Sequence, residues 1–199
     1  MPSFCYIKYI RLPSKEFTMS ELKQTFLERT LIILKPDTLQ RGLVGEIISR
    51  FERAGLKIIA MKMVAPDELH FHKHYEGISN LISRWGEDIY NVTLSQMTET
   101  PVITFVLEGV EAVAYVRKLV GTTDPKDSAP GTIRGDYTHI TRGFTNPIGS
   151  TLPNILHASG NTEEAVKEIA LWFNDSEIYD NYDTAQGPVI RGYIPNKKR

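Results

Sequence analysis

Short β-rich apolar runs alternate with helical segments through the middle of the chain, and this alternation restricts the fold more than any other feature. Each run has the length and composition of a buried strand. The segments between the runs repeat apolar side chains at helical spacing. The expected strands span residues 29–36, 56–64 and 101–109, and the expected helices span residues 42–55, 66–85 and 110–121.

A stretch rich in glycine, proline and threonine follows from residue 121 to residue 153. Within it, "GDYTHITR" at residues 135–142 is expected to form a fourth strand. The resulting order predicts a ferredoxin-like βαββαβ fold of the α/β class. Such a fold is a four-stranded antiparallel sheet, here expected to carry helices packed on one face.

Composition places the chain among ordinary globular proteins. With 199 residues and 41% hydrophobic residues, it can bury one full core. We expect a domain at residues 25–186, an N-terminal extension at 1–24 and a C-terminal tail at 187–199. The formal charge of −1 argues against a nucleic-acid binder or a protein drawn to an anionic membrane. An anionic ligand would have to be held by a local cluster of cations.

The N-terminal residues predict neither a secretion signal nor a membrane span. Lys8 and Arg11 interrupt the apolar stretch that a signal peptide would need. The single Cys5 fits a reducing compartment, so a cytoplasmic location is expected. Residues 4–12 alternate as a strand would, but Met19 is an equally good natural start, and the sequence leaves both possibilities open.

His157 lies in a loop just before a predicted helix. Asn161 and Glu164 have the spacing of a capping box, and free backbone N–H groups at such a helix start favour anions such as phosphate. A lone histidine in a loop is more often structural than catalytic. Here, however, phosphate-type donors cluster in three ordered segments, 35–47, 124–136 and 154–160.

Five side chains supply donors suited to a nucleotide. Lys35 carries a compact charge, whereas Arg117 and Arg134 carry planar forks that match phosphate oxygens. Thr123 adds a hydroxyl for phosphate, and Asn154 adds an amide suited to a sugar hydroxyl.

Four motifs together resemble the nucleoside diphosphate kinase family. They are Lys-Pro-Asp at 35–37, Gln-Arg-Gly-Leu at 40–43, Pro-Gly-Thr-Ile-Arg-Gly-Asp at 130–136, and Asn-x-x-His-x-Ser at 154–159. The similarity covers roughly residues 28–186. The motifs are highly specific in combination.

The resemblance implies ping-pong transfer of a γ-phosphate from a nucleoside triphosphate to a nucleoside diphosphate through a phosphohistidine. His157 would be the nucleophile, and Glu168 would fix its tautomer. Mg²⁺ is expected on the nucleotide phosphates, without a dedicated protein cage. A homo-oligomer, tetramer or hexamer, is also implied. The remaining residues implied to bind nucleotide are Lys35, Tyr75, Arg117, Thr123, Arg134, Asn154 and Ser159.

The chain departs from the family pattern at three places. Ala158 stands where glycine is usual, and it should be tolerated if its φ is negative. Two segments, near residues 76–100 and 137–153, are longer than the common form, and the usual Phe-Phe pair for base stacking is absent. Ile89 or Tyr90 stands nearest to that place.

Two alternatives stay open at this point. One is a catalytically silent nucleotide-binding module that serves regulation. The other is a zinc site at His70 and His74, which share a helix face but lack a further ligand set. A solvated helix face with one buried histidine is the expected outcome there.

Overall fold

The computed structural model describes residues 26–190. The expectations for the N-terminal extension and for most of the C-terminal tail therefore lie outside the described residues. Within the described range, no helix combines the length and the apolar character that crossing a membrane requires.

The strands form one antiparallel sheet in the order β2-β3-β1-β4. This order confirms the ferredoxin-like fold, because the first and third strands pair at the centre and the second and fourth lie at the edges. β1 and β3 pair along their full length, whereas β4 pairs with β1 over three residues. The strands are β1 (Leu27–Leu34), β2 (Lys57–Val64), β3 (Val102–Val110) and β4 (Leu156–Ala158).

The expected fourth strand at residues 135–142 is wrong. Helix α8 (Ile133–Tyr137) begins there instead, because the Thr132 side chain accepts a hydrogen bond from the N–H of Gly135 and caps the helix. The true fourth strand, β4, contains His157, which lies opposite Ile33 of β1. A strand of three residues is too short to show an alternating pattern.

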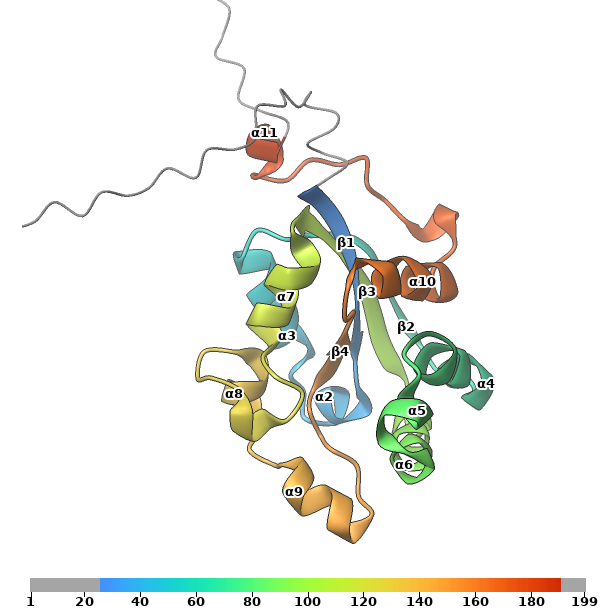
Figure 1. Cartoon of the computed structure of the whole chain (residues 1–199). Helices are drawn as coiled ribbons and strands as arrows, with labels where there is room; N and C mark the ends of the chain where they lie inside the picture. The colour runs from blue at the N-terminus through green and yellow to red at the C-terminus, as the bar shows by residue number, and fades with distance from the viewer. Residues whose placement is uncertain (1–25, 191–199) are drawn as a thin grey trace, which may run out of the picture.

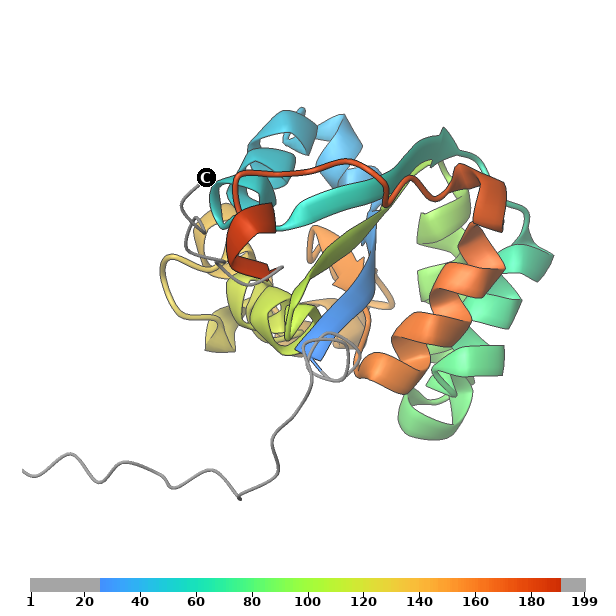
Figure 2. The same cartoon turned by 90° about the horizontal axis from the view of Figure 1, so that it is seen from above.

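Helices cover both faces of the sheet, so the expectation of one covered face is also wrong (Figure 2). Side chains of β1 alternate between two apolar clusters. Ile32 and Leu34 pack into one cluster, and Leu31 and Ile33 pack into the other. All four are fully buried, which is why this strand reads as a continuous apolar run.

The helices that cover the two faces of the sheet divide between these two clusters. One cluster receives side chains from α3 (Val44–Arg53) and α7 (Ala112–Val120). The other is built by α4 (Glu68–His72), the π-helical turn η1 (Lys73–Ile78), α6 (Glu87–Thr98) and α10 (Thr162–Trp172). Gly55 and Gly121, both at positive φ, follow α3 and α7, as the sequence indicated.

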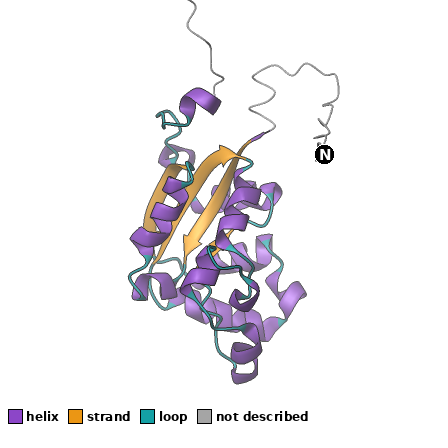
Figure 3. Ribbon diagram, turned by 90° about the vertical axis from the view of Figure 1, so that its left-hand side faces the viewer, coloured by secondary structure: helices purple, strands orange, loops and turns teal. Residues whose placement is uncertain are grey.

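Shorter helices gather beyond the end of the sheet where β1 finishes (Figures 1 and 3). They are α2 (Pro36–Gln40), α5 (Leu81–Trp85), η2 (Pro125–Asp127), α8, α9 (Arg142–Thr145) and η3 (Asn146–Ile148). At the opposite end, the chain continues through η4 (Asp175–Glu177) to α11 (Gly187–Ile190). There the N–H of Tyr179 donates to the carbonyl of Ile59, 2.7 Å away, which ties this segment to β2.

Candidate active site

A cavity of about 610 Å³ opens at the end of the sheet where the short helices gather. Segments far apart in the sequence meet around it. Seven of the nine residues expected at the site line it: Lys35, Tyr75, Arg117, Thr123, Arg134, Asn154 and His157. The other two, Glu168 and Ser159, lie behind His157 and are fully buried.

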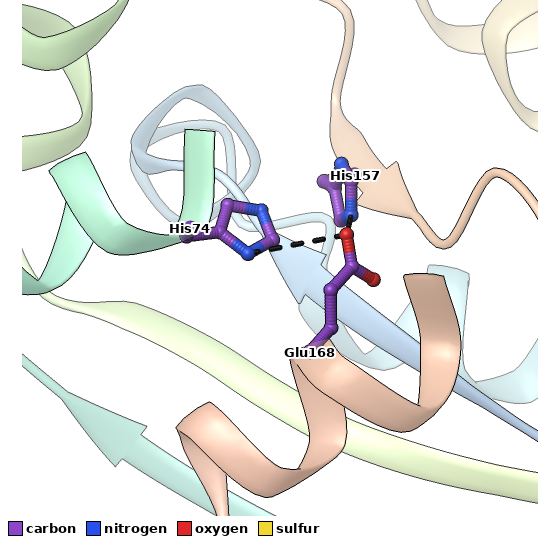
Figure 4. A group of neighbouring side chains, drawn as sticks. All are labelled: His74, His157 and Glu168. Atoms are coloured by element: carbon purple, nitrogen blue, oxygen red, sulfur yellow. Dashed lines mark hydrogen bonds and ion pairs between the residues drawn. The ribbon is translucent and has the colours of Figure 1, made fainter. Parts of the chain in front are cut away.

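His157 is held by a carboxylate from α10 (Figure 4). Its Nε2 lies 2.9 Å from Oε1 of Glu168, and the hydroxyl of Ser159 donates to Oε2 of the same carboxylate at 2.6 Å. The Ser159 hydroxyl also accepts a hydrogen bond from the N–H of Leu31. Ser159 is therefore placed to support Glu168 beside His157.

The carboxylate determines which imidazole nitrogen is free. Burial alone would raise the pKa of Glu168, but the charge and hydrogen bond of His157 outweigh it and lower the pKa to about 2. An ionised carboxylate only accepts hydrogen bonds, so the proton of His157 resides on Nε2. Nδ1 then carries a lone pair, and the ring lines the cavity with this nitrogen directed away from Glu168 (Figure 4).

His74 is a member of this cluster that the sequence did not predict as functional. Its ring is fully buried and stands edge-on to His157, with ring centroids 4.6 Å apart. Nδ1 of His74 accepts a hydrogen bond from Nε1 of Trp172 at 3.3 Å and lies 4.0 Å from Oε1 of Glu168. Burial, followed by the charge of His157, lowers the pKa of His74 to about 3, so this ring is neutral. The sequence signal that could have identified His74 as part of the site is its position directly before Tyr75, which was expected there.

The histidines of "HFHKH" do not gather around one point. His70 stands edge-on to Trp172, with ring centroids 4.5 Å apart, whereas His74 faces His157 and Glu168. The expected single buried histidine on this helix face is confirmed, and it is His74. Among the described residues, the one cluster with metal-ligand spacing is His74, His157 and Glu168.

Tyr75 lines the cavity beside His157. Its ring lies 6.5 Å from that of His157 and stacks on Phe71 of the core. Its hydroxyl is buried and has no hydrogen-bond partner within the described range, although Tyr75 lines the cavity. Burial raises the pKa of Tyr75, so the hydroxyl keeps its proton and is a donor for a bound ligand.

Lys35 and Asn154 form a hydrogen-bonded pair in the cavity lining. Nζ of Lys35 donates to Oδ1 of Asn154 at 2.7 Å, and Nδ2 of Asn154 donates to the carbonyl of Thr123 at 3.0 Å. Burial is the main cause that lowers the pKa of Lys35 to about 8. The ammonium still carries its charge at neutral pH, and it keeps two of its three N–H donors for a ligand.

Most of the N–H groups of Arg134 donate hydrogen bonds to the protein's own backbone. Its guanidinium donates four hydrogen bonds to the carbonyls of Gly121, Thr122, Asn154 and Leu156. A guanidinium has five N–H groups, so one is left for the cavity. Arg134 therefore acts as a clamp between two loops, and it brings a buried positive charge to the site with little remaining hydrogen-bonding capacity.

The Lys-Pro-Asp-Thr segment explains how the backbone before His157 is held. Ile155 has a φ of 72°, which is strained for a β-branched residue. Its N–H donates to Oδ2 of Asp37 at 3.0 Å, and its carbonyl accepts from the hydroxyl of Thr38 and from the N–H of Lys35. Ala158 is not among the described residues with positive φ, so alanine fits there as expected.

The two residues expected to stand nearest to a nucleotide base, Ile89 and Tyr90, differ in their position relative to the cavity. Tyr90 is buried, and its hydroxyl lies 2.8 Å from Nδ1 of His72, outside the cavity lining. Ile89 does line the cavity, and so does Trp85, whose ring is half-exposed. Arg142, from the second long segment, also lines it. Trp85 and Arg142 were not predicted, because both lie in segments that depart from the family pattern.

Comparison with known proteins agrees with this geometry. Residues 28–178 match the family model described as nucleoside diphosphate kinase. A nucleoside diphosphate kinase of Borreliella burgdorferi is 45% identical over 152 residues, covering 76% of this chain and 90% of that protein. One from Pyrococcus furiosus is 48% identical over 154 residues, covering 77% and 88%.

Solved structures give the same result. A transition-state mimic of the Borrelia burgdorferi enzyme with bound vanadate and ADP superimposes with a TM-score of 0.79 at 43% identity, covering 83% of this chain and 97% of that one. A Halobacterium salinarum enzyme in complex with CDP gives 0.67 at 37% identity, covering 82% and 97%.

A ferredoxin-like sheet that presents a carboxylate-bound histidine in a cation-lined cavity has the fold and chemistry of a nucleotide phosphotransferase. The chain belongs to the nucleoside diphosphate kinase family. Its reaction is the transfer of a terminal phosphoryl group from a nucleoside triphosphate to a nucleoside diphosphate.

Proposed function

We propose that Nδ1 of His157 is the nucleophile of a ping-pong reaction. Nδ1 forms a bond to the γ-phosphorus of the donor, the bond from that phosphorus to the bridging oxygen breaks, and the diphosphate leaves. An acceptor diphosphate then attacks the phosphohistidine, which returns the electron pair to Nδ1. The observation that supports this proposal most directly is the 2.9 Å hydrogen bond between Nε2 of His157 and Oε1 of Glu168, which leaves Nδ1 as the free nitrogen.

Attack by Nδ1 places a positive charge on the imidazole of His157, and a negatively charged carboxylate lies beside the ring to stabilise it. The carboxylate of Glu168 lies in direct contact with the ring and is shielded from water. On the phosphate side, Lys35, Arg117 and Arg134 supply positive charge and Thr123 supplies a hydroxyl. We propose that these four groups bind the β- and γ-phosphates and stabilise the phosphoryl group in flight.

We further propose that Tyr75 donates to the transferred phosphoryl group and that Asn154 binds the ribose. The unpartnered hydroxyl of Tyr75 supports the first role. For the second, Asn154 has one N–H of its Nδ2 remaining beside Lys35, since the other donates to Thr123.

Mg²⁺ would arrive with the nucleotide. The cluster of His74, His157 and Glu168 offers two imidazoles, whereas Mg²⁺ prefers oxygen ligands in octahedral geometry. Glu164 is the one carboxylate among the described residues that line the cavity. The nucleotide phosphates are therefore the proposed ligands, and the ion would neutralise part of their charge when bound.

A labelling experiment tests the nucleophile. The protein is incubated with γ-labelled ATP, and an acid-labile, base-stable protein label is measured and then chased with a different diphosphate. We expect the wild type to be labelled and His157→Ala to carry no label. His139→Ala is the matched control, because this histidine is exposed and outside the cavity lining. Absence of label on the wild type would favour the silent nucleotide-binding module.

We also propose that the chain assembles into a tetramer or hexamer in the cytoplasm, with residues 25–186 as the catalytic domain. Met61 and Met63 are exposed on β2, an edge strand, which supports association between copies. The single Cys5 supports a reducing compartment. Light scattering on the purified protein measures the oligomeric state, and a monomer at micromolar concentration would contradict the first proposal.

A further inference from the structure

The two segments that are longer than the family pattern meet at the mouth of the cavity. Trp85, the last residue of α5, belongs to one, and Arg142, the first residue of α9, belongs to the other. The guanidinium carbon of Arg142 lies 4.1 Å from the centroid of the Trp85 ring, within cation–π distance. The backbone N–H of Arg142 donates to Oδ2 of Asp124 at 3.3 Å, which anchors the start of α9.

The guanidinium of Arg142 is charged, half-buried and free to bind. It makes no hydrogen bond or ion pair with another residue in the described part of the chain, so all five N–H donors remain. It lines the same cavity as Lys35, Arg117 and Arg134. Burial is the main cause of the lowered pKa of Lys35 and of Arg134, and the charge of Arg142 lowers both further.

The wall of the cavity carries an excess of positive charge. Its lining includes five cations, Lys35, Arg84, Arg117, Arg134 and Arg142, against the one carboxylate of Glu164. Arg134 retains a single N–H group for a ligand, because four are used by backbone carbonyls. Lys35 keeps two N–H groups for a ligand, and Arg142 adds a full guanidinium of unused donors that can hydrogen-bond further oxygens of a polyphosphate.

We propose that Arg142, held in position by the face of Trp85, is a further binding residue for the phosphates of nucleoside di- and triphosphates. This inference rests on the proposed function of the same cavity. The two long segments thereby form one additional wall of the phosphate site. Stacking on Trp85 restricts the rotamers of Arg142 before the nucleotide arrives, which lowers the entropy cost of binding.

Calorimetric titration with ADP and with adenosine tests this role on the full-length protein. We expect Arg142→Gln to raise the Kd for ADP roughly 10- to 100-fold, as the loss of hydrogen bonds to a charged group does. Adenosine affinity stays unchanged, because adenosine has no phosphate. Arg53→Gln is the matched control, since Arg53 is exposed on α3 and makes the same change of charge away from the cavity.

Two variants of Trp85 test the positioning step. Trp85→Phe keeps an aromatic face and should bind ADP within a few-fold of wild type, whereas Trp85→Ala should weaken ADP binding. In the Arg142→Gln background, Trp85→Ala should have a much smaller effect on ADP, because the residue that it positions is already gone. Equal losses in both backgrounds would overturn the positioning role.

The outcomes separate this inference from the proposed function. ADP affinity of Arg142→Gln equal to that of Arg53→Gln would overturn the inference, and so would equal weakening of ADP and adenosine. Both results concern binding and leave the labelling of His157 unaffected. A wild type that binds ADP but is never labelled by ATP would overturn the proposed nucleophile while leaving the role of Arg142 intact.

Discussion

At the scale of single residues, the site depends on one carboxylate with two fixed partners. Oε1 of Glu168 accepts from His157, and Oε2 accepts from Ser159, whose position is set by the N–H of Leu31 in β1. The ring of His157 is therefore oriented by α10 and by β1, a central strand of the sheet, in addition to its own strand β4. A buried network whose members are all satisfied keeps its geometry because any change leaves a polar atom unpaired.

Replacing Glu168 with Gln tests the value of this charge. The amide keeps the shape but cannot neutralise the imidazolium that forms when Nδ1 attacks. We expect the rate of phosphohistidine formation in a single turnover to fall roughly 10²-fold, or about 2.7 kcal/mol. Glu163→Gln, exposed on the same helix, is the control. A rate for Glu168→Gln within twofold of this control would show that the charge is not used.

At the scale of elements, α2 and β4 are held together through the backbone of Ile155. The strained φ of this residue persists because Asp37 and Thr38 at the start of α2 bind its N–H and its carbonyl. Ile155 is itself fully buried, so its side chain also holds the strand in place. The family motif at residues 35–37 thus has a structural role in addition to the phosphate binding that we propose for Lys35.

Asp37→Ala removes one of these anchors and leaves the N–H of Ile155 buried without a partner. We expect the free energy of unfolding to fall by about 1–3 kcal/mol. Activity should fall too, because His157 lies only two residues after Ile155 in the chain. Urea denaturation measures the first effect. Asp37→Asn retains an acceptor oxygen and should lose less stability, and equal losses for the two variants would argue against the hydrogen bond as the cause.

At the scale of the whole molecule, two neighbouring buried groups make stability depend on pH in different ranges. His74 has a pKa of about 3 in the folded chain, against 6.5 for a histidine exposed to water, so the unfolded state binds the proton first. Its contribution is present above pH 6.5 and is lost as the pH falls toward 3. Glu168, with a pKa lowered from 4.5 to about 2, contributes above pH 4.5 and loses that contribution toward pH 2.

His74→Gln isolates the first of these ranges. Glutamine does not titrate, and its carbonyl can accept the hydrogen bond from Trp172. Between pH 6.5 and 4.5 we expect the wild type to lose stability relative to this variant by up to about 1.4 kcal/mol per pH unit. Urea unfolding at several pH values checks this slope, and parallel curves for the two proteins would contradict a neutral buried His74.

Local sequence patterns predicted most of the sheet and the overall fold. The continuous apolar run of β1 and the glycine and proline signals at element ends located three strands, the order of the elements predicted the fold, and the four motifs together identified the family. These features are local, since each depends on neighbouring residues or on a short motif. The fourth strand and the second covered face were missed because neither leaves a periodic pattern of its own.

The family, and the choice of His157 and six further residues that turn out to line one cavity, were thus determined by the sequence, through motifs that need no knowledge of distance. Only the tertiary structure showed that Ser159 supports Glu168, that the guanidinium of Arg134 donates to backbone carbonyls, and that His74 is neutral. It alone placed Trp85 against Arg142. The reason is physical: hydrogen-bond partners and burial are set by contacts between segments that are distant along the chain, and no local pattern records them.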